Sequence, residues 1–234
     1  MRPRLPCPSS AFAGFRFPPE VIVVAVRWYL RYGLSYRDVE ELLAERGVEV
    51  DHVTVYRWVQ RFTPMLVEAA RPCRHAVGNR WFVDETYVKV GGVWRYVYRA
   101  VDQHGQIIDV YVSRRRNTEA ARRFFDGALA DHARPVEVVT DKAQTLLAAV
   151  DDVLPDSLPI TDRWCNNRVE ADHGRLKARL RPMRGLKCDR TAAVVIRGHA
   201  FVQNLRRGHY ELGVDVRCSQ LRLAAAFDDL AEMI

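Results

Sequence analysis

The spacing of apolar residues changes along the chain from a helical to an extended period. Between residues 18 and 62, apolar side chains recur every three or four positions, which predicts three helices. The first ends near Gly33, and Ser35 begins the second as its N-cap, with Asp38 as its capping-box partner. Asp51 is placed to cap the third helix.

Three short helices with a glycine-containing turn before the last are typical of a helix-turn-helix. On the third predicted helix, Thr54, Arg57 and Arg61 share the face opposite the apolar stripe. Polar and cationic groups on that face suit base edges and phosphates in a DNA major groove. A plain three-helix bundle with a solvated basic face is the alternative interpretation of this pattern.

From residue 80 onward the apolar pattern has a period of two, which predicts β-strands. Three strands are expected at residues 81–90, 93–101 and 107–113. The dipeptide Gly91-Gly92 is typical of the two-residue turn of a hairpin and joins the first two.

The second half of the chain is predicted to be mostly helical. A helix over residues 118–130 precedes a short buried strand over 136–140, and residues 151–162 are expected to form a loop. Further helices are predicted from Asp141 onward and near residues 167–180, 190–207 and 221–233. This order is that of an α/β, ribonuclease H-like domain, a mixed sheet flanked by helices. A small all-α helix-turn-helix domain precedes it.

Three carboxylates stand where such a domain could hold metal ions. Asp84 lies inside the first strand, where an unpaired buried charge is costly. Asp141 stands at the C-terminal end of the fourth strand, the edge at which open α/β sheets bind ligands. Glu170 opens a helix. Carboxylates hold Mg²⁺ while leaving coordination positions for water and phosphate, so the three together predict a metal site.

Each carboxylate has a structural alternative. Asp84 could pair with a lysine, Asp141 could cap the following helix, and Glu170 could form a capping box with Asn167.

The helix that carries Glu170 is also rich in cations. Helical phase places Glu170, His173 and Lys177 on one face. We therefore expect His173, Arg175 and Lys177 to contact the DNA backbone.

The charge balance indicates a polyanionic partner. The chain has 36 Lys and Arg against 29 Asp and Glu, a net charge of +7. Residues 168–207 alone hold eleven Lys and Arg against three acids, so the positive charge is concentrated there. Such a density favours nucleic acid over a solvated helical surface.

Cysteine usage and hydropathy exclude several protein classes. The five cysteines are scattered and contain no C-x-x-C pair, so neither a zinc knuckle nor a disulfide framework is predicted. The longest apolar run, residues 21–26, is too short to span a bilayer. We expect a cytoplasmic, nucleoid-associated protein with no membrane partner.

The motifs resemble those of one family of bacterial transposases, the insertion-sequence IS-six (IS-twenty-six-like) family. The resemblance covers most of the chain, from about Phe15 to Tyr210, in the family's order. Five stretches carry it, at residues 27–38, 54–59, 83–90, 98–102 and 166–177.

The resemblance implies a DDE triad of Asp84, Asp141 and Glu170, and selects Asp84 over its neighbour Glu85. It also implies a ribonuclease H-like fold and dependence on Mg²⁺ or Mn²⁺, with two ions in each active site. The expected partners are double-stranded DNA, as transposon ends with terminal inverted repeats and as target, and a second copy of the chain in a homodimer. Cleavage would expose a 3′-OH that attacks the target DNA.

The domain organisation follows from these assignments. Five segments are expected, namely a disordered tail (1–14), the helix-turn-helix domain (15–63), a linker (64–79), the catalytic domain (80–210) and a C-terminal helix (211–234).

One departure from the family's pattern bears on activity. Only 28 residues separate Asp141 from Glu170, fewer than is usual, and Trp164-Cys165 replaces a tyrosine-leucine type of pair. A catalytically impaired DNA-binding protein is therefore the alternative to an active transposase. A ribonuclease or resolvase on the same fold is a third hypothesis, although neither needs the N-terminal DNA reader.

Overall fold

The N-terminal region folds as three α-helices. The computed structural model describes residues 10–161, 167–183, 186–218 and 220–234. The helices are α1 (Pro19–Arg31), α2 (Tyr36–Ala44) and α3 (His52–Ala69). Ser35 and Asp38 form the predicted capping box at the start of α2. The Asp51 carboxylate accepts a hydrogen bond from the Val53 amide (2.8 Å) and caps α3. Both predicted caps are confirmed.

A five-stranded mixed sheet forms the centre of the remaining chain. Its strands are β1 (Arg80–Val90), β2 (Val93–Asp102), β3 (Ile107–Ser113), β4 (Glu137–Thr140) and β5 (Leu158–Ile160), in the order β3-β2-β1-β4-β5. The first three strands pair antiparallel, whereas β4 is parallel to both β1 and β5. This topology, preceded by a helical region, confirms the predicted fold class.

The fifth strand lies in the segment for which a loop was predicted. Helix α5 (Gln144–Val153) occupies the start of that segment and β5 follows it. The loop prediction over residues 151–162 was therefore wrong for residues 151–153 and 158–160. Strand β5 is only three residues long, contains Pro159 and is largely exposed, so it lacks the alternating pattern that reveals a strand.

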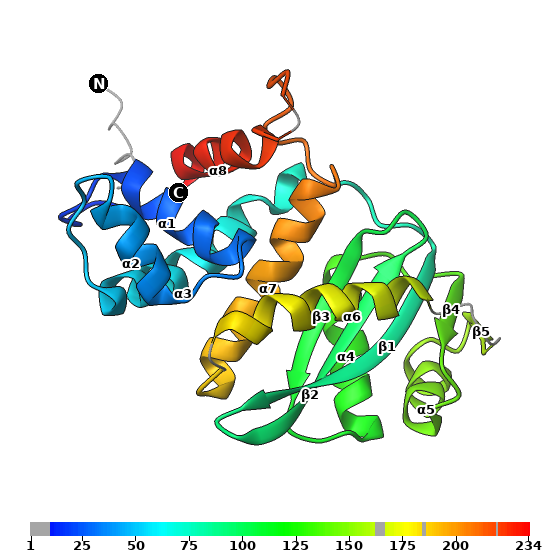
Figure 1. The fold of residues 1–234 in the computed structure, drawn as a ribbon. Helices are drawn as coiled ribbons and strands as arrows, with labels where there is room; N and C mark the ends of the chain where they lie inside the picture. The colour runs from blue at the N-terminus through cyan, green and yellow to red at the C-terminus, as the bar shows by residue number, and fades with distance from the viewer. Residues whose placement is uncertain (1–9, 162–166, 184–185, 219) are drawn as a thin grey trace, which may run out of the picture.

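Helices cover both faces of the sheet (Figure 1). On one face, α4 (Thr118–Asp131) and α5 pack over a core that includes Trp81 and Val83. On the other face, α6 (Asn167–Leu180) and α7 (Asp189–Arg206) pack over a core that includes Phe82 and Val88. Residues 81–83 of β1 thus alternate between two cores, as the two-residue period of a strand requires.

The N-terminal helices and the sheet share one hydrophobic core. Buried residues of α1 and α3 belong to the same apolar cluster as those of α7 and of the C-terminal helix α8 (Arg222–Met233). Two short 3₁₀ helices, η1 (Arg71–Cys73) and η2 (Arg181–Met183), follow α3 and α6. Figure 1 shows α8 lying beside α1 at the opposite end of the molecule from β5.

Two of the predicted segments, the linker and the N-terminal tail, contribute residues to this packing. Helix α3 runs through Pro64 into the predicted linker, because burial of Phe62 and Leu66 offsets the roughly 3 kcal/mol cost of an internal proline. Phe12, assigned to a disordered tail, is buried and stacks on Phe62 with ring centroids 4.7 Å apart. Residues 1–9 of that tail and the Trp164-Cys165 pair lie outside the described residues.

Candidate active site

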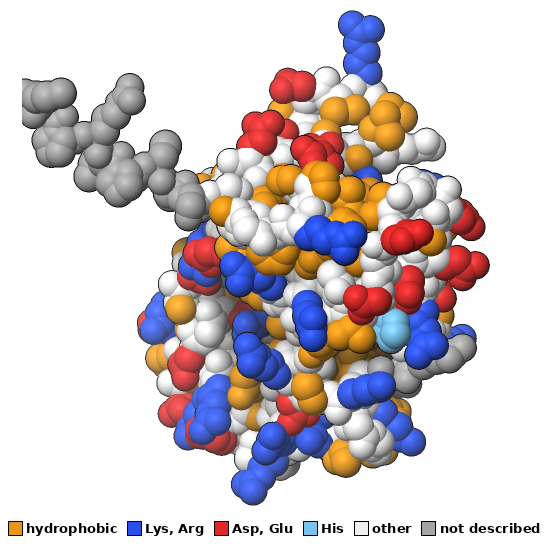
Figure 2. Space-filling view, turned by 90° about the vertical axis from the view of Figure 1, so that its left-hand side faces the viewer, with side chains coloured by type: hydrophobic (Ala, Val, Ile, Leu, Met, Phe, Trp, Pro, Cys, Tyr) orange, Lys and Arg blue, Asp and Glu red, His pale blue; other side chains and the backbone are white. Residues whose placement is uncertain are grey.

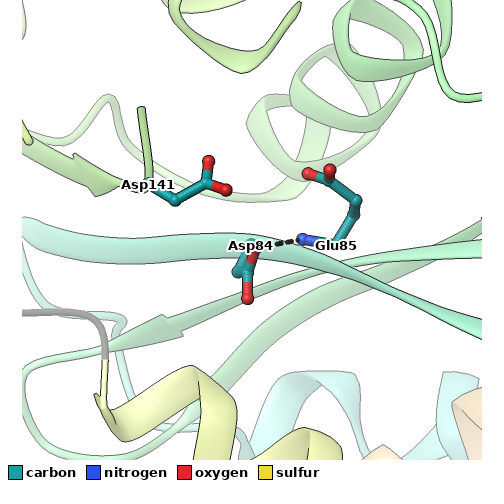
Figure 3. Close-up of side chains that lie close together, drawn as sticks. All are labelled: Asp84, Glu85 and Asp141. Carbon is teal, nitrogen blue, oxygen red and sulfur yellow. Dashed lines mark hydrogen bonds between the residues drawn. The ribbon is translucent and has the colours of Figure 1, made fainter. Parts of the chain in front are cut away.

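Strand register brings Asp84 and Asp141 side by side. Strands β1 and β4 run parallel, with Val83 opposite Thr140, so the next residue on each strand is an aspartate. Ligand oxygens of Asp84, Asp141 and Glu85 all lie within 4.8 Å of one another. Figure 3 shows Asp141 and Glu85 on one side of β1, and Asp84 extending toward the other side with one oxygen bonded to the Glu85 amide. The spacing suits a divalent cation, which prefers several oxygen ligands.

Glu85 is the member of this group that the sequence did not reveal. Its side chain is 3% exposed and forms an ion pair with Arg116. Its second carboxylate oxygen, Oε2, has no hydrogen-bond partner among the described residues. Successive strand residues point to opposite faces, so adjacency to Asp84 did not imply a shared site.

The electrostatic environment of Asp84 is strongly negative. Burial, which is the largest cause, and the charges of Glu85 and Asp141 together raise its pKa to about 7. Its Oδ1 atom accepts a hydrogen bond from the Glu85 amide at 2.8 Å. Among the described residues the basic side chain next to Asp84 is His173 rather than the lysine of the structural alternative.

His173 does not neutralise this charge. Its Nδ1 atom lies 3.6 Å from Asp84 Oδ2, which is too long for a hydrogen bond. Burial, with Arg99 nearby, lowers the pKa of His173 to about 3, so the ring is neutral at physiological pH. The carboxylate group therefore fits a bound cation, because no lysine or arginine in the described part of the chain pairs with Asp84.

Asp141 does not cap the helix that follows it. Helix α5 begins at Gln144, with Ala143 in the N-cap position and no side-chain cap. The Asp141 carboxylate accepts a hydrogen bond from the Ala143 amide at 3.0 Å and is otherwise exposed. The capping alternative is therefore wrong, and most of this carboxylate is free to bind a ligand.

Glu170 stands apart from the other two predicted ligands. It lies in the first turn of α6, and its side chain is exposed. Its negative charge helps to raise the pKa of Asp84, after burial and the nearer carboxylates, so it lies within electrostatic range. It is not one of the three residues whose ligand atoms converge. The structure thus brings together Asp84 and Asp141 and leaves Glu170 outside their group.

A buried ion network docks α6 on the sheet beside this site. Arg99 is the cross-strand neighbour of Asp84 and is fully buried. It forms an ion pair with Asp172 of α6, which also pairs with Arg207. Burial alone would raise the pKa of Asp172, but the two arginines outweigh it and hold the pKa below its usual value. This network attaches α6 to the sheet at Asp172, two residues after Glu170.

Comparison with known proteins places these features in a family. A family model described as a DDE domain matches residues 78–209. A transposase for the insertion sequence-like element IS431mec from Staphylococcus aureus is 39% identical over 170 residues, covering 70% of this chain and 75% of that protein. The chain belongs to the DDE transposases of the IS-six (IS-twenty-six-like) family.

The chain is also similar to two further proteins. The transposase of insertion sequence IS257 in transposon Tn4003 of Staphylococcus aureus has the same identity and coverage. An uncharacterized protein, pYV0051, of Yersinia pseudotuberculosis is 38% identical over 67 residues, which is 27% of this chain and 63% of that protein. The protein is a DDE-type transposase, a polynucleotidyl transferase.

Solved structures similar to the transposase include viral integrases. The catalytic core domain of the HTLV-2 integrase, in complex with magnesium, superposes with a TM-score of 0.41 and 17% identity, covering 57% of this chain and 88% of that chain. A simian T-cell lymphotropic virus intasome gives a TM-score of 0.41 and 18% identity, covering 66% and 58%. Within the described ranges, no helix of the transposase has the length and apolar character needed to span a membrane.

The predicted DNA-reading residues of the transposase lie on α3. Arg57 and Arg61 are exposed, whereas Thr54 is partly buried and its hydroxyl donates to Asp51 (2.7 Å). The guanidinium of Arg61 lies over the ring of Phe15 at 5.3 Å. Figure 2 views the side of the molecule where the N-terminal helices lie, and Lys and Arg side chains there are mixed with acidic and apolar ones.

Of the three α6 residues predicted to contact the DNA backbone, one is buried and two are exposed. His173 is only 6% exposed and faces the sheet, so the prediction that it contacts DNA was wrong. His173 lies close to Glu170 in helical phase, but the side of α6 that carries His173 is packed against the sheet. Arg175 and Lys177 are exposed.

Part of the basic charge between residues 168 and 207 is used inside the protein. Arg179 is buried and donates to the Tyr29 carbonyl, while Arg207 pairs with Asp172. Charge density in the sequence therefore overstated the basic surface available to nucleic acid.

Proposed function

We propose that this transposase binds the terminal inverted repeats of an insertion sequence and, with Mg²⁺ or Mn²⁺, cleaves and transfers DNA strands. The observation that carries the proposal is the closeness of Asp84 and Asp141 at the end of β4, with no lysine or arginine paired with Asp84 among the described residues. A buried carboxylate in such a state is costly unless it binds a metal ion. The family membership supports the same reaction.

Asp84, Asp141 and Glu170 are the proposed metal ligands. Two divalent ions in such a site activate an attacking oxygen and stabilise the leaving one at phosphorus. Asp84 and Asp141 are held in place by strand register, whereas Glu170 approaches them with the first turn of α6 when substrate is bound. Glu85 stays with Arg116 and adds negative charge without being a required ligand.

Double-stranded DNA is the proposed partner on two surfaces. Thr54, Arg57 and Arg61 on α3 contact the transposon end, and Arg175 and Lys177 contact phosphates close to the carboxylates. Two copies of the chain form a homodimer that holds two transposon ends, and the protein acts at the nucleoid.

Strand cleavage by purified protein tests this proposal. The substrate is a labelled duplex that carries the terminal inverted repeat of the insertion sequence. The protein should nick this duplex in the presence of Mg²⁺ or Mn²⁺. Asp84→Asn and Asp141→Asn should each reduce cleavage about 1,000-fold or more, equivalent to about 4 kcal/mol of transition-state stabilisation. Both variants should bind the same DNA as tightly as the wild type.

A matched control and a direct metal readout make the result specific. Asp156→Asn alters an exposed acid between Asp141 and Glu170 and should leave cleavage unchanged. Calorimetric titration with Mn²⁺ should show binding to the wild type and to Asp156→Asn, and little to Asp84→Asn. Equal Mn²⁺ binding by Asp84→Asn would contradict the assignment of the site.

A second function is favoured by one observation, the position of Glu170 outside the carboxylate group. A catalytically impaired transposase would bind the inverted repeats and act as a repressor. This function predicts normal end binding, no cleavage by the wild type in Mg²⁺ or Mn²⁺, and no further change in Glu170→Gln. Loss of wild-type cleavage in Glu170→Gln would exclude it.

A further inference from the structure

The hairpin that joins β1 and β2 exposes aromatic and aliphatic side chains to solvent. Tyr87 is 55% exposed, Trp94 is 49% exposed and Val93 is 55% exposed. The Tyr87 and Trp94 rings meet at 90°, with centroids 5.0 Å apart. Large apolar groups clustered on a surface mark an interaction site more often than isolated ones do.

Lysines surround this aromatic pair and indicate the chemistry of its partner. Lys89 Nζ lies 4.9 Å from the centre of the Trp94 ring, and Lys177 Nζ lies 4.9 Å from that of Tyr87. Protein–protein interfaces are depleted in lysine. Sites for single-stranded nucleic acid combine aromatic faces, on which bases stack, with cations that follow the backbone.

The turn of the hairpin is fixed against the segment that follows α6. The Gly91 amide donates to the Leu186 carbonyl at 2.7 Å, and Val90 forms a β-bridge with Leu186. Gly91 has φ 57°, and a Cβ at this position would lie 3.0 Å from the Lys187 carbonyl oxygen. The aromatic pair is therefore held on a braced hairpin rather than on a free loop (Figure 1).

The distance from the carboxylate group suits a nucleic-acid strand that spans both sites. Tyr87 follows Glu85 on the same face of β1 and lies three residues, or about 10 Å, beyond Asp84. Lys177 lies seven residues, again about 10 Å, beyond Glu170 along α6. At about 3.4 Å per nucleotide, either path corresponds to roughly three nucleotides.

We propose that Tyr87 and Trp94 form a stacking site for an unpaired nucleotide of the DNA substrate, about three nucleotides from the carboxylates, while Lys89 and Lys177 hold its phosphates. This inference rests on the proposed function, because it assumes that DNA is held at the carboxylates. It adds the requirement that the duplex opens next to the cleaved position.

Equilibrium binding in EDTA tests the inference without cleavage. The probes are a fluorescein-labelled blunt duplex of mixed sequence, the same duplex with an unpaired four-nucleotide tail, and the same tail without bases. Wild-type protein should bind the tailed duplex roughly tenfold more tightly than the blunt one, because stacking contributes in this range for each base. The abasic tail, which keeps the phosphates, should lose most of this preference.

Substitutions assign the preference to the aromatic pair. Trp94→Ala and Tyr87→Ala should remove the tenfold preference and leave affinity for the blunt duplex unchanged. Trp94→Phe should retain most of the preference. Leu221→Ala, a matched control at a residue that is 56% exposed and outside the hairpin, should retain all of it. Both aromatic residues are about half exposed, so these variants are expected to fold.

Three outcomes would overturn the inference. They are a wild type that binds blunt and tailed duplexes equally, an alanine variant that keeps the preference, and an abasic tail that binds as well as the normal tail. Conversion of a dimer to a monomer by Trp94→Ala, with tail preference intact, would reassign the surface to contact between copies. Because no metal is present, failure of strand cleavage leaves this result unaffected, so the two proposals fail separately.

Discussion

Asp84 is the cross-strand neighbour of Arg99 in the sheet, whereas Asp172 reaches the same arginine from helix α6. Asp172 is 1% exposed and is bound by Arg99 and Arg207, so its pKa is held below the usual value. Asp84 is partly buried among other carboxylates, and its pKa is raised to about 7. Two aspartates close to one arginine therefore have opposite electrostatic environments.

The difference separates a structural ion network from a binding site. In the network around Asp172 every charge has a partner of opposite sign, and the arrangement holds α6 against the sheet. In the carboxylate group around Asp84 the negative charge exceeds what the described cations offset. A protein retains such an arrangement at the expense of stability when a bound ion or substrate completes it.

The largest expected effect comes from removing the paired carboxylate. Asp172→Asn keeps the shape of the side chain but leaves Arg99 and Arg207 without a counter-charge in the protein interior. Breaking a buried ion pair in this way typically costs about 3–5 kcal/mol. Urea denaturation should show a loss of that size. An unchanged midpoint would mean that the network does not hold α6 in place.

Removing the charge of Asp84 should change the free energy of unfolding in the opposite direction. The folded-state pKa of Asp84 lies above its unfolded value, so its charge destabilises the metal-free protein above about pH 7 and less so at lower pH. Asp84→Asn should therefore raise the free energy of unfolding at pH 8 in EDTA, on the order of 2 kcal/mol. Thermal unfolding at pH 8 and pH 5 should show the gain shrinking with acidity, and a destabilised variant at pH 8 would refute this account.

Protonation of the buried His199 near Arg99 should have a smaller effect on the free energy of unfolding. Burial, with Arg99 nearby, lowers the pKa of His199 to about 3, against an ordinary value of 6.5. The stability that its neutral form contributes is present above pH 6.5 and is lost as pH falls toward 3. Between pH 7.5 and pH 5.5, His199→Gln should lose about 1.4 kcal/mol less than the wild type. Parallel pH profiles of the two proteins would show that folding does not lower the pKa of His199, and would contradict this account.

The smallest change in the free energy of unfolding is expected for a solvent-exposed ion pair. Glu119 and Arg123 form an ion pair at 3.0 Å on α4, and both side chains are more than half exposed. Glu119→Gln should change the free energy of unfolding by less than about 0.5 kcal/mol. It provides a baseline for Asp172→Asn, and a loss of several kcal/mol here would show that removal of any carboxylate destabilises this fold.

Features that depend on a few neighbouring residues were predictable from the sequence. The capping box of Ser35 and Asp38 and the hairpin turn at Gly91 follow from local hydrogen bonding and backbone conformation. The ends of β1 and β4 were predicted within one residue, which placed Asp84 inside β1 and Asp141 directly after β4; that these strands are neighbours came from the structure. Strand β5 escaped prediction because its stabilisation comes from pairing with β4 rather than from its own pattern.

Some assignments failed because they concerned which side chains meet. The ion pair of Glu85 with Arg116 joins residues 31 positions apart, and that of Arg99 with Asp172 joins residues 73 apart. His173 shares helical phase with exposed residues, yet the packing of α6 turns it toward Asp84. No local pattern distinguishes a cation that faces DNA from one that is used inside the fold.

The sequence by itself determined the helices, the first four strands, two helix caps, and the positions of Asp84 inside the first strand and Asp141 at the end of the fourth. These follow from short-range periodicity and hydrogen bonding, which act over a few residues. Only the tertiary structure decided that the N-terminal helices share a core with α7 and α8, that Glu85 joins the carboxylate group, and that Glu170 stays outside it. Those outcomes depend on how whole elements pack, because distant side chains acquire their neighbours, burial and charge environment only when the chain has folded.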